Sequence, residues 1–380
     1  MKVLLICKSL NTELGGIQTH TRFLATYLAK QGAEVHILTG RGWQDEPTNR
    51  LKDVKVISLK HLPGYRLKGL RALADDLFFN LKACQWLLRH ASEYDLLHVQ
   101  GRSGLLYALW PWRAKPCIVT FHGLTREEFR NSRRFGKVSP DQALHQWLFH
   151  RLERMAYQKA EGVITVSEFM RQHLQQHLRV HRWEVGVISN GVDLKRFQQV
   201  TSHPLTVTYL GRLDPNKGLK SLPILLSHLP QPLRLRIIGG GRMGPWLRQE
   251  IDRLGLSHRV DWTGPLPNDQ VMPLLADSLA LVVPSYYEPQ GLVVLEAFER
   301  GVPVIASAVG GLKELVKHNQ NGWLVKPGDA ESMAQRLVEL YQNPSLRQRL
   351  AQNARREVEM RYQWRQIAAE TQEFYQAVIK

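Results

Sequence analysis

Cysteine is scarce in this sequence, with three in 380 residues. Cys7, Cys84 and Cys117 form no C-x-x-C pair, and three cysteines cannot all pair with one another. This pattern excludes a disulfide-stapled secreted fold and a structural zinc site built on cysteine pairs. We therefore expect a chain that folds in the reducing cytoplasm.

Long apolar runs are also missing. No stretch approaches the roughly 20 apolar residues that cross a bilayer. The segment Met1–Cys7 resembles a strand and is too short for a signal peptide. Internal repeats and low-complexity tails are absent. We expect a globular cytoplasmic protein of two domains, because 380 residues allow each domain to bury its own core.

Acidic residues are few compared with basic ones. The chain carries 51 Lys and Arg against 34 Asp and Glu, a formal net charge of +17. Residues 1–193 contribute +11 and residues 194–380 contribute +6. Such a charge favours anionic partners: nucleic acid, acidic lipid or a phosphorylated glycan. No nucleic-acid recognition motif accompanies the charge and the aromatic residues are scattered, so we expect no nucleic-acid partner.

The first half begins with the pattern of a doubly wound sheet. An apolar strand at 2–8 is followed by a loop ending in Gly15 and Gly16, a helix at 17–31 and a strand at 34–39. This order is typical of Rossmann-like α/β domains. Paired glycines before a helix let the backbone approach a phosphate, although an ordinary tight turn explains them equally well.

Two histidines lie near the ends of later strands. The strands at 95–100 and 117–122 each end in a glycine turn. Ligands of open α/β sheets bind beyond the carboxyl ends of the strands. We therefore predict His98 near the ligand site and His122 at it, and a purely structural role for either histidine stays open.

Two basic stretches of the first half mix charge with apolar side chains. Residues 61–90 have an amphipathic helical pattern, and residues 126–137 carry five basic residues with two phenylalanines between them. Each stretch fits either an ordinary solvated surface or a surface for acidic lipid. We therefore retain an anionic membrane surface as a partner to be tested.

The second half is expected to open with a strand at 205–210 and a glycine-bounded loop, Gly211–Gly218. Arg212 offers a fork of hydrogen-bond donors and Lys217 a point charge, and this pair suits a pyrophosphate. A plain surface loop is an equally good interpretation of these residues alone.

A second glycine cluster, Gly239–Gly244, matches G-x-G-x-x-G between a strand and a helix. The motif indicates a dinucleotide-binding unit. Here, however, it does not stand at the first strand–helix turn of its domain, and the next acidic residue, Asp261, begins a strand rather than ending one. We instead interpret Gly240 and Gly241 as points where the backbone closely approaches a nucleotide.

The most informative stretch is residues 284–296. An apolar strand precedes it, Pro284, Pro289 and Gly291 break regular structure, and an apolar helix follows. Glu288 lies just before the helix N-terminus, whose free N–H groups attract anions. Glu296 lies inside the helix among apolar neighbours, where an unpaired carboxylate is costly. Two such carboxylates suit a polyhydroxylated, phosphate-bearing ligand, or else are a capping and a solvated glutamate.

This stretch resembles the E-x7-E motif of the retaining, GT-B-fold glycosyltransferases of family 4, of the type found in bacterial envelope and polysaccharide synthesis. In that family the first glutamate bonds the donor sugar and the second bonds the nucleotide ribose. The loop 211–218 is similar to the family's donor-pyrophosphate segment, and residues 301–311 to the strand and loop after its motif helix. With a looser likeness in the Gly15-Gly16 loop, the resemblance spans nearly the whole chain.

The resemblance implies an α/β fold of two Rossmann-like domains facing a cleft, with a C-terminal helix that returns to the first domain. The expected segments are an acceptor-side domain at 1–195, a nucleotide-sugar-binding domain at 196–362 and the returning helix at 363–380. The residue pattern Val187–Asp193 resembles the segment that links the two domains in the family.

Residue roles follow from the same resemblance. The expected catalytic residues are Glu288, His122, Arg212 and Lys217. The expected donor-binding residues are Gly16, Arg212, Lys217, Gly240, Gly241, Glu288, Gln290, Gly291, Leu292 and Glu296. The expected acceptor-side residues are Gly15, Gly16 and His98. Gln290 departs from the family pattern, since many members carry Phe there, and this leaves the shape of the sugar pocket open.

The implied reaction moves a hexose, with retention, from a UDP-, GDP- or ADP-sugar to a lipid-linked or envelope glycan, as in lipopolysaccharide or polysaccharide synthesis. Arg212 and Lys217 would stabilise the leaving nucleoside diphosphate. No D-x-D segment is placed to hold a metal on the phosphates, so we expect neither a metal nor a cofactor. The enzyme would work in the cytoplasm, with peripheral docking on the inner face of the membrane as an extension. The alternative is a GT-B-fold sugar-nucleotide epimerase.

Overall fold

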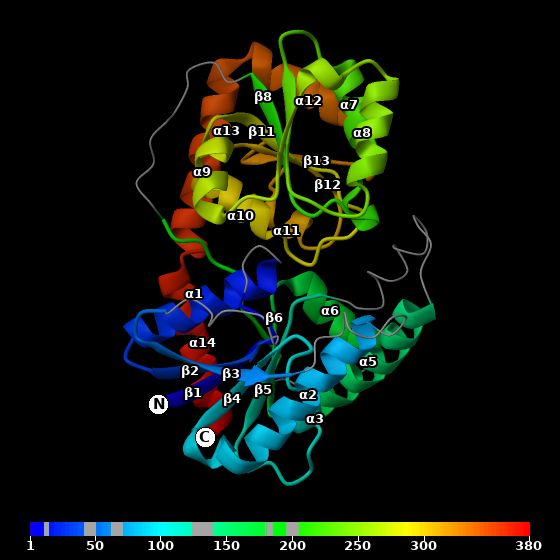
Figure 1. Ribbon diagram of the computed structural model, residues 1–380. Helices are drawn as coiled ribbons and strands as arrows, with labels where there is room; N and C mark the ends of the chain where they lie inside the picture. The colour runs from blue at the N-terminus through cyan, green and yellow to red at the C-terminus, as the bar shows by residue number, and fades with distance from the viewer. Residues whose placement is uncertain are drawn as a thin grey trace. The chain divides into compact units, whose positions relative to one another are not determined.

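A computed structural model describes residues 1–10, 15–41, 51–61, 71–123, 140–178, 180, 185–194 and 205–380. The chain divides into two compact units (Figure 1). Among the described residues, the first unit holds 1–190 together with 364–380, and the second holds 191–363. The chain thus leaves the first unit at Asn190 and rejoins it at Trp364.

The first unit is built on a seven-stranded parallel sheet in the order β3-β2-β1-β4-β5-β6-β7. Its central strands β4 and β5 are buried along their whole length, because parallel strands are covered by helices on both faces. The strands are β1 Lys2–Ile6, β2 Glu34–Arg41, β3 Val54–Lys60, β4 Leu96–Gln100, β5 Cys117–Phe121, β6 Gly162–Thr165 and β7 Val185–Val187.

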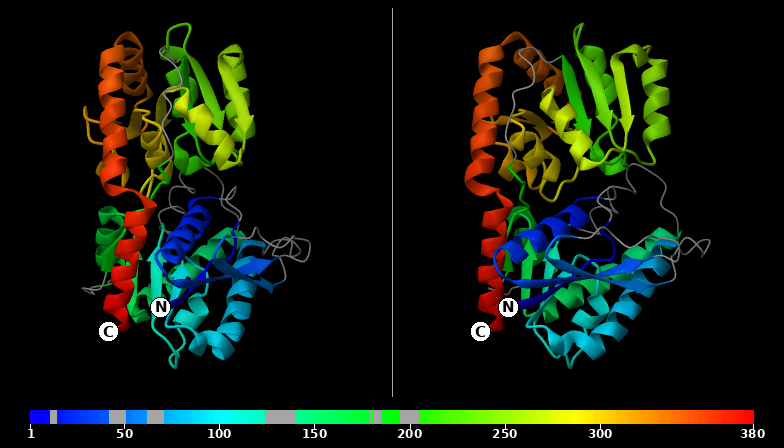
Figure 2. Two further views of the ribbon diagram at one scale, coloured as in Figure 1. Left: turned by 90° about the vertical axis from the view of Figure 1, so that its left-hand side faces the viewer. Right: turned by 60° about the vertical axis from the view of Figure 1, so that its left-hand side comes forward.

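Helices cover both faces of this sheet (Figure 2). Helix α1 and the C-terminal helix α14 share one hydrophobic core with β1 and β2. Helices α2, α3 and α5 contact one another on the opposite face. The helices of the unit are α1 Gly16–Lys30, α2 Arg71–His90, the 3-10 turn η3 Ala91–Glu93, α3 Leu105–Ala108, α5 Pro140–Lys159, α6 Glu168–His177 and α14 Trp364–Ile379.

The second unit has a six-stranded sheet in the order β10-β9-β8-β11-β12-β13, also parallel throughout. Its strands are β8 Thr206–Leu210, β9 Arg234–Ile238, β10 Val260–Gly264, β11 Ser278–Val283, β12 Val304–Ser307 and β13 Gly322–Val325. Its helices are η4 Pro215–Lys217, α7 Ser221–His228, α8 Gly244–Arg253, η5 Ser257–Arg259, α9 Asn268–Ala276, α10 Leu292–Glu299, α11 Leu312–Leu315, α12 Ala330–Gln342 and α13 Pro344–Arg361.

Each sheet has one point where the strand order reverses. In the first unit it lies between β1 and β4, and in the second between β8 and β11. Ligands of doubly wound folds bind beyond the carboxyl ends of the strands at such a point. The loops after these four strands are therefore where a site is expected, and they contain most of the residues singled out above.

The expectation of two Rossmann-like α/β domains with a returning C-terminal helix is confirmed. In α14, Trp364, Ile367, Ala368 and Tyr375 are buried in the core of the first unit. The amphipathic pattern expected over 61–90 is a helix from Arg71 onward, whereas residues 62–70 and the basic stretch 126–137 lie outside the described residues. None of the helices in the described ranges combines the length and the apolar character that spanning a membrane requires.

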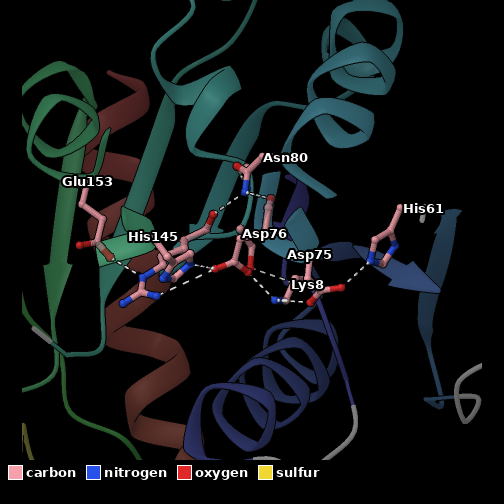
Figure 3. A network of polar contacts seen from close by, with 10 residues as sticks. Lys8, His61, Asp75, Asp76, Asn80, His145 and Glu153 are labelled. Atoms are coloured by element: carbon pink, nitrogen blue, oxygen red, sulfur yellow. Dashed lines mark hydrogen bonds and ion pairs between the residues drawn. The ribbon is translucent and has the colours of Figure 1, made fainter. Parts of the chain in front are cut away.

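A polar network ties α2 and α5 to the carboxyl end of β1 (Figure 3). The ammonium of Lys8, just beyond β1, bonds both Asp75, at 2.8 Å, and Asp76. His145 of α5 bonds the other Asp76 oxygen at 2.8 Å. Burial opposes ionisation of Asp76, but the bond from His145 and the charges of Lys8 and Arg102 lower its pKa to about 2. Asp76 is therefore a fixed anion in the interior of the first unit.

The same network continues to the end of β4. Arg102 donates to Glu153 of α5 at 3.0 Å. Asn80 of α2 donates to the Arg102 carbonyl at 3.0 Å and accepts from the Gly104 N–H at 3.0 Å. These bonds satisfy backbone groups of the loop that follows β4. They fix the loop after β4, which lies at the edge of the sheet where a ligand is expected.

Candidate functional site

The loops after β8 and β11 are fastened together in the second unit. Tyr286 N–H donates to the carbonyl of Asn216 at 2.9 Å. Gly218 has a φ of +68°, and a Cβ at that position would lie 1.8 Å from the carbonyl oxygen of Pro284. Only glycine permits this contact. The closeness of the two loops brings residues that are far apart in sequence into one site.

Lys217 and Glu288 form an ion pair across these loops. The Lys217 Nζ lies 2.7 Å from Glu288 Oε2, and Ser285 Oγ donates to the same oxygen at 3.4 Å. The side chains are 19% and 13% exposed. A partly buried charge needs a partner, and each residue supplies it for the other. The structure thus unites two of the predicted catalytic residues, 71 positions apart in sequence.

Arg212 lies on the β8 loop with its side chain 56% exposed. A guanidinium nitrogen of Arg212 lies 3.1 Å from Asp214 Oδ2. The other carboxylate oxygen, Asp214 Oδ1, lies 3.8 Å from Arg242 Nε. The buried Tyr209 hydroxyl donates to the Arg212 carbonyl at 2.8 Å and holds the loop. Burial and the nearby charges of Glu288 and Asp214 raise the pKa of Tyr209, which keeps this hydroxyl protonated. Tyr209, Asp214 and Arg242 were not predicted, although Arg242 lies inside the noted glycine cluster.

The glycine cluster after β9 packs against the Arg212 loop. A Cβ on Gly239 would lie 2.0 Å from the carbonyl oxygen of Gly211, and one on Gly241 would lie 2.7 Å from the backbone of Leu213. Leu213 N–H donates to the Gly240 carbonyl at 2.9 Å. Gly239 and Gly241 are therefore required by contacts within the protein, whether or not a nucleotide approaches them. Gly240 has room for a Cβ, with its nearest described neighbour at 3.6 Å.

Helix α10 begins close to Glu288, both along the chain and in space. Its N-cap is Gly291, with a φ of +108°, and no side chain caps this end. The carbonyl of Glu288 accepts from Gly311 N–H at 3.0 Å. Gln290 is buried and Leu292 is partly exposed. A helix start without a side-chain cap, next to a carboxylate and a lysine, offers N–H donors to an anionic ligand.

Glu296 lies one turn further along α10 and is partly exposed. Asn268 Nδ2 donates to its carboxyl at 3.3 Å. Burial, and after it the charge of Glu299, raise the pKa of Glu296 to about 8. The carboxyl is therefore largely protonated at neutral pH, in a position where a hydroxyl-bearing ligand could bond it.

Three histidines of the first unit lie near one another, and two of them, His98 and His122, were predicted. His98 in β4 is completely buried, with ring nitrogens 2.5 Å from the Tyr375 hydroxyl and 2.5 Å from Thr120 Oγ1. Burial lowers its pKa to about 3, so it is neutral. His98 was expected on the acceptor side, but in the structure neighbours occupy both its nitrogens. It can act there only through the residues around it.

His122, just after β5, is partly exposed. Its Nε2 lies 2.7 Å from Gln100 Oε1, and its ring meets the ring of His20 edge-on with centroids 4.7 Å apart. His20, in α1, bonds Asn190 at 2.7 Å. Burial lowers the pKa of His122 well below its ordinary value and that of His20 to about 4. His20 and Gln100 were not predicted, although Gln100 shares a strand face with His98 two residues away.

Gly15 and Gly16 lie at the start of α1. Gly15 is the N-cap, with a φ of +145°, and Gly16 is the exposed first residue of the helix. No neighbour within the described ranges comes closer than 3.7 Å to a Cβ built on Gly15. A Cβ there would make an ordinary van der Waals contact with Gln18 Oε1. Among the described residues, no three His, Cys, Asp or Glu side chains are grouped so as to hold a metal ion.

Two family models match this chain. The model for Glycosyltransferase Family 4 matches residues 14–196, and the model for Glycosyl transferases group 1 matches residues 193–357. A glycogen synthase of Mycobacterium tuberculosis is 27% identical over 403 residues, covering 96% of this chain and 91% of that protein. A D-inositol 3-phosphate glycosyltransferase of Corynebacterium glutamicum is 27% identical over 395 residues, covering 96% and 92%.

Solved structures share the fold over nearly the whole length. Sucrose-phosphate synthase from Thermosynechococcus elongatus superposes with a TM-score of 0.84 at 24% identity, covering 99% of this chain and 98% of that one. Anabaena HepE in complex with UDP-glucose gives 0.75 at 23% identity, covering 98% and 99%. Together with the matched models and the two Rossmann-like units, these likenesses identify the chain as a glycosyltransferase of the GT-B fold.

Proposed function

We propose that this glycosyltransferase moves a hexose, with retention of configuration, from a nucleotide-sugar to a lipid-linked or envelope glycan. The observation that carries the proposal is the Lys217–Glu288 pair, 2.7 Å apart beside the start of α10, with Arg212 on the same loop as Lys217. A cation for phosphate and a carboxylate for hydroxyls lie side by side, as a sugar diphosphate requires. Nothing in the described parts of the two units favours the alternative, a sugar-nucleotide epimerase.

In this scheme the diphosphate of the donor draws Lys217 and Arg212 onto its oxygens. The ion pair between Lys217 and Glu288 is thereby weakened, and Glu288 accepts hydrogen bonds from hydroxyls of the sugar. Glu296 bonds the ribose. As the bond from C1 to the diphosphate breaks, the acceptor oxygen bonds C1 on the same face, and its proton passes to the leaving phosphate oxygen. The two cations stabilise the charge that develops on the leaving group, which is the main electrostatic contribution we propose.

UDP-sugars are our first choice of donor, because the similar HepE structure is a complex with UDP-glucose. The envelope acceptor is supported by the likeness to WaaG, a glycosyltransferase involved in lipopolysaccharide biosynthesis, at a TM-score of 0.75 and 18% identity, covering 98% of this chain and 99% of that one. We further propose that transfer needs no metal, since Arg212 and Lys217 are placed to take its role on the phosphates.

An exposed surface of α2 and α5 supports docking on an anionic membrane. We call it the α2–α5 surface. The helices are in contact, and each exposes apolar side chains beside basic ones. Trp147 is 55% exposed, and the Arg151 guanidinium lies 4.3 Å from the centroid of its ring. The described exposed residues of the two helices that are basic or bulky and apolar are Leu81, Lys82, Leu88, Arg89, Leu144, Trp147, Arg151, Arg154, Met155 and Lys159. Aromatic and basic side chains on one surface suit the headgroup region of acidic lipids.

The proposal is tested by a donor screen followed by product analysis. Thermal shifts with UDP-glucose, GDP-mannose and ADP-glucose should identify one donor, because a ligand that binds the native state raises the unfolding temperature. Transfer from that donor to lipid-linked glycans is then measured in excess EDTA, with the anomeric configuration of the product determined by NMR. Transfer with an α product from an α donor supports the proposal. An inverted product, or activity that EDTA abolishes and Mn²⁺ restores, contradicts it.

A further inference from the structure

Gln100 holds a central place among the buried polar groups of the first unit. It ends β4, pairs in register with Thr120 of β5 and is 1% exposed. Its Oε1 lies 2.7 Å from His122 Nε2, and its Nε2 lies 3.2 Å and 3.4 Å from the two ring nitrogens of His98. One amide thus connects the buried histidine to the partly exposed one.

The Gln100 amide directs its NH₂ at the His98 ring and its oxygen at His122. Hydroxyls of Tyr375 and Thr120 occupy the His98 nitrogens and fix that ring. With the amide NH₂ directed at the His98 ring, the amide oxygen faces His122. A carbonyl oxygen can only accept a hydrogen bond, so the His122 Nε2 must carry the proton and donate it. In a neutral imidazole the other nitrogen, Nδ1, then keeps its lone pair.

The surroundings keep His122 neutral and in place. The titratable groups that face it are His20 on α1 and His98 on β4, with Tyr375 of α14 behind His98. The first two are themselves neutral, because burial lowers the pKa of each. The structure gives Nδ1 of His122 no hydrogen-bond partner among the described residues. Within the described part of the chain, an acceptor nitrogen is therefore available on a ring that packing has already oriented.

We propose that Gln100 is a positioning residue that holds His122 as the Nε2–H tautomer, so that Nδ1 accepts a hydrogen bond from a hydroxyl of the donor sugar. The inference rests on the proposed function, in which His122 contacts the sugar. The inference adds the direction of this hydrogen bond and the reason for it. His122 acts as an acceptor, and Gln100 rather than a carboxylate stands behind it so that the ring stays uncharged.

Two substitutions of nearly the same size separate this role from simple packing. Gln100→Met removes the acceptor, so His122 is free to adopt the Nδ1–H tautomer. Gln100→Glu keeps an acceptor but adds a charge that favours the imidazolium form of His122 as the pH falls. We expect nucleotide-sugar binding by Gln100→Met to weaken about tenfold at every pH, the size of one hydrogen bond. We expect Gln100→Glu to bind poorly at pH 6 and to recover toward wild type at pH 8.5.

The first measurement is independent of activity. Nitrogen-15 NMR of imidazole-labelled full-length protein, with His122→Ala used to assign the signals, reports which ring nitrogen is protonated. We expect His122 as Nε2–H in wild type and a shift toward Nδ1–H in Gln100→Met. An Nδ1–H ring in wild type, or an unchanged tautomer in Gln100→Met, overturns the inference.

The second measurement compares Kd for UDP-glucose with Kd for UDP, which has no sugar to reach His122. Gln100→Met should weaken the first and spare the second. If His122→Ala weakens UDP-glucose binding and Gln100→Met does not, Gln100 has no positioning role. If His122→Ala leaves UDP-glucose binding unchanged, the proposed sugar contact itself fails. The two results are thus distinguishable.

Discussion

Position 218 requires glycine, because any larger residue would clash with the backbone of the β11 loop. Alanine there would have its Cβ 1.8 Å from a backbone oxygen of the β11 loop, whereas Gly255 has the same φ of +68° with no described atom within 4 Å of a Cβ. Both Gly→Ala changes incur the strain of a left-handed residue, on the order of 1 kcal/mol. Gly218→Ala should cost about 2 kcal/mol more, because it forces the loops apart.

Urea unfolding of Gly218→Ala and Gly255→Ala measures this difference. We also expect Gly218→Ala to weaken nucleotide binding, because it moves Lys217 away from Glu288, while Gly255→Ala binds normally. Equal losses of stability in the two variants would mean that the loops do not depend on the contact.

Glu296 should make the stability of the protein depend on pH. Its pKa is raised to about 8 in the folded state, above the ordinary value of 4.5 for a glutamate. Ionising it therefore opposes folding: the penalty is absent below pH 4.5 and complete above pH 8. Because the carboxyl is partly exposed, we expect a penalty of only about 1–2 kcal/mol after screening. Glu296→Gln should be more stable than wild type at pH 9 and equal to it at pH 4.

This prediction is checked by unfolding wild type, Glu296→Gln and Glu331→Gln across that pH range. Glu331 is on α12 with its side chain 70% exposed and serves as the matched control. Wild-type and Glu296→Gln curves that run parallel from pH 4 to pH 9 would show that Glu296 ionises normally.

At the scale of elements, the first residue of α14 is one of four that bury this helix in the core of the first unit. Trp364 is 1% exposed, stacks on Phe23 of α1 with ring centroids 5.6 Å apart and meets His20 edge-on. Trp364→Ala should cost about 3–5 kcal/mol, the usual loss for a buried tryptophan. Trp112→Ala, at a site 80% exposed, should cost little. Hydrogen exchange should show α1 and α14 opening faster and the sheet of the second unit unchanged. Normal protection of α14 in Trp364→Ala would refute this anchoring.

The α2–α5 surface gives the membrane proposal a definite test. Trp147→Ser combined with Arg151→Gln and Arg154→Gln should reduce co-sedimentation with anionic vesicles, because each basic residue contributes about 1 kcal/mol near an acidic leaflet. Arg253→Gln with Arg356→Gln, exposed on α8 and α13, removes the same charge from the other unit and should bind like wild type. Wild-type protein that remains in the supernatant at low salt would exclude membrane docking.

A feature can be predicted from sequence when the residues that determine it are close together in the chain. The strand, turn and helix around 279–299 could be predicted because an apolar run, two prolines and Gly291 are all within that segment. The role of His98 could not, because its hydroxyl partner Tyr375 is 277 positions away on α14. His20 was missed for the same reason, because its partner Asn190 is 170 positions away. Sequence spacing reports periodicity, whereas a buried hydrogen bond depends on which strands and helices the topology brings together.

At the scale of the whole molecule, each of the two units contains a different kind of polar group. The second unit holds the ion pair and the arginines suited to a diphosphate, and the first holds neutral histidines suited to hydroxyl groups. The ion pair of the second unit lies in the loops after β8 and β11, where the strand order reverses, as the topology predicts. In the first unit, His98 lies within β4, beside the reversal, whereas His20 is on α1 and His122 follows β5. The resemblance to family 4 was needed to assign roles, since the glycine loops and Glu288 also fit ordinary turns.

The most direct test of the proposed glycosyl transfer is the kcat/KM of Lys217→Ala with the donor identified in the thermal-shift screen. Lys220→Ala, an exposed lysine three residues along, is the matched control. We expect Lys217→Ala to lose about 2–4 kcal/mol of transition-state stabilisation, roughly thirtyfold to a thousandfold in kcat/KM, while Lys220→Ala stays at the wild-type rate. A Lys217→Ala protein that is folded, as judged by its circular dichroism, and transfers sugar at the wild-type rate would contradict the assignment of the donor site.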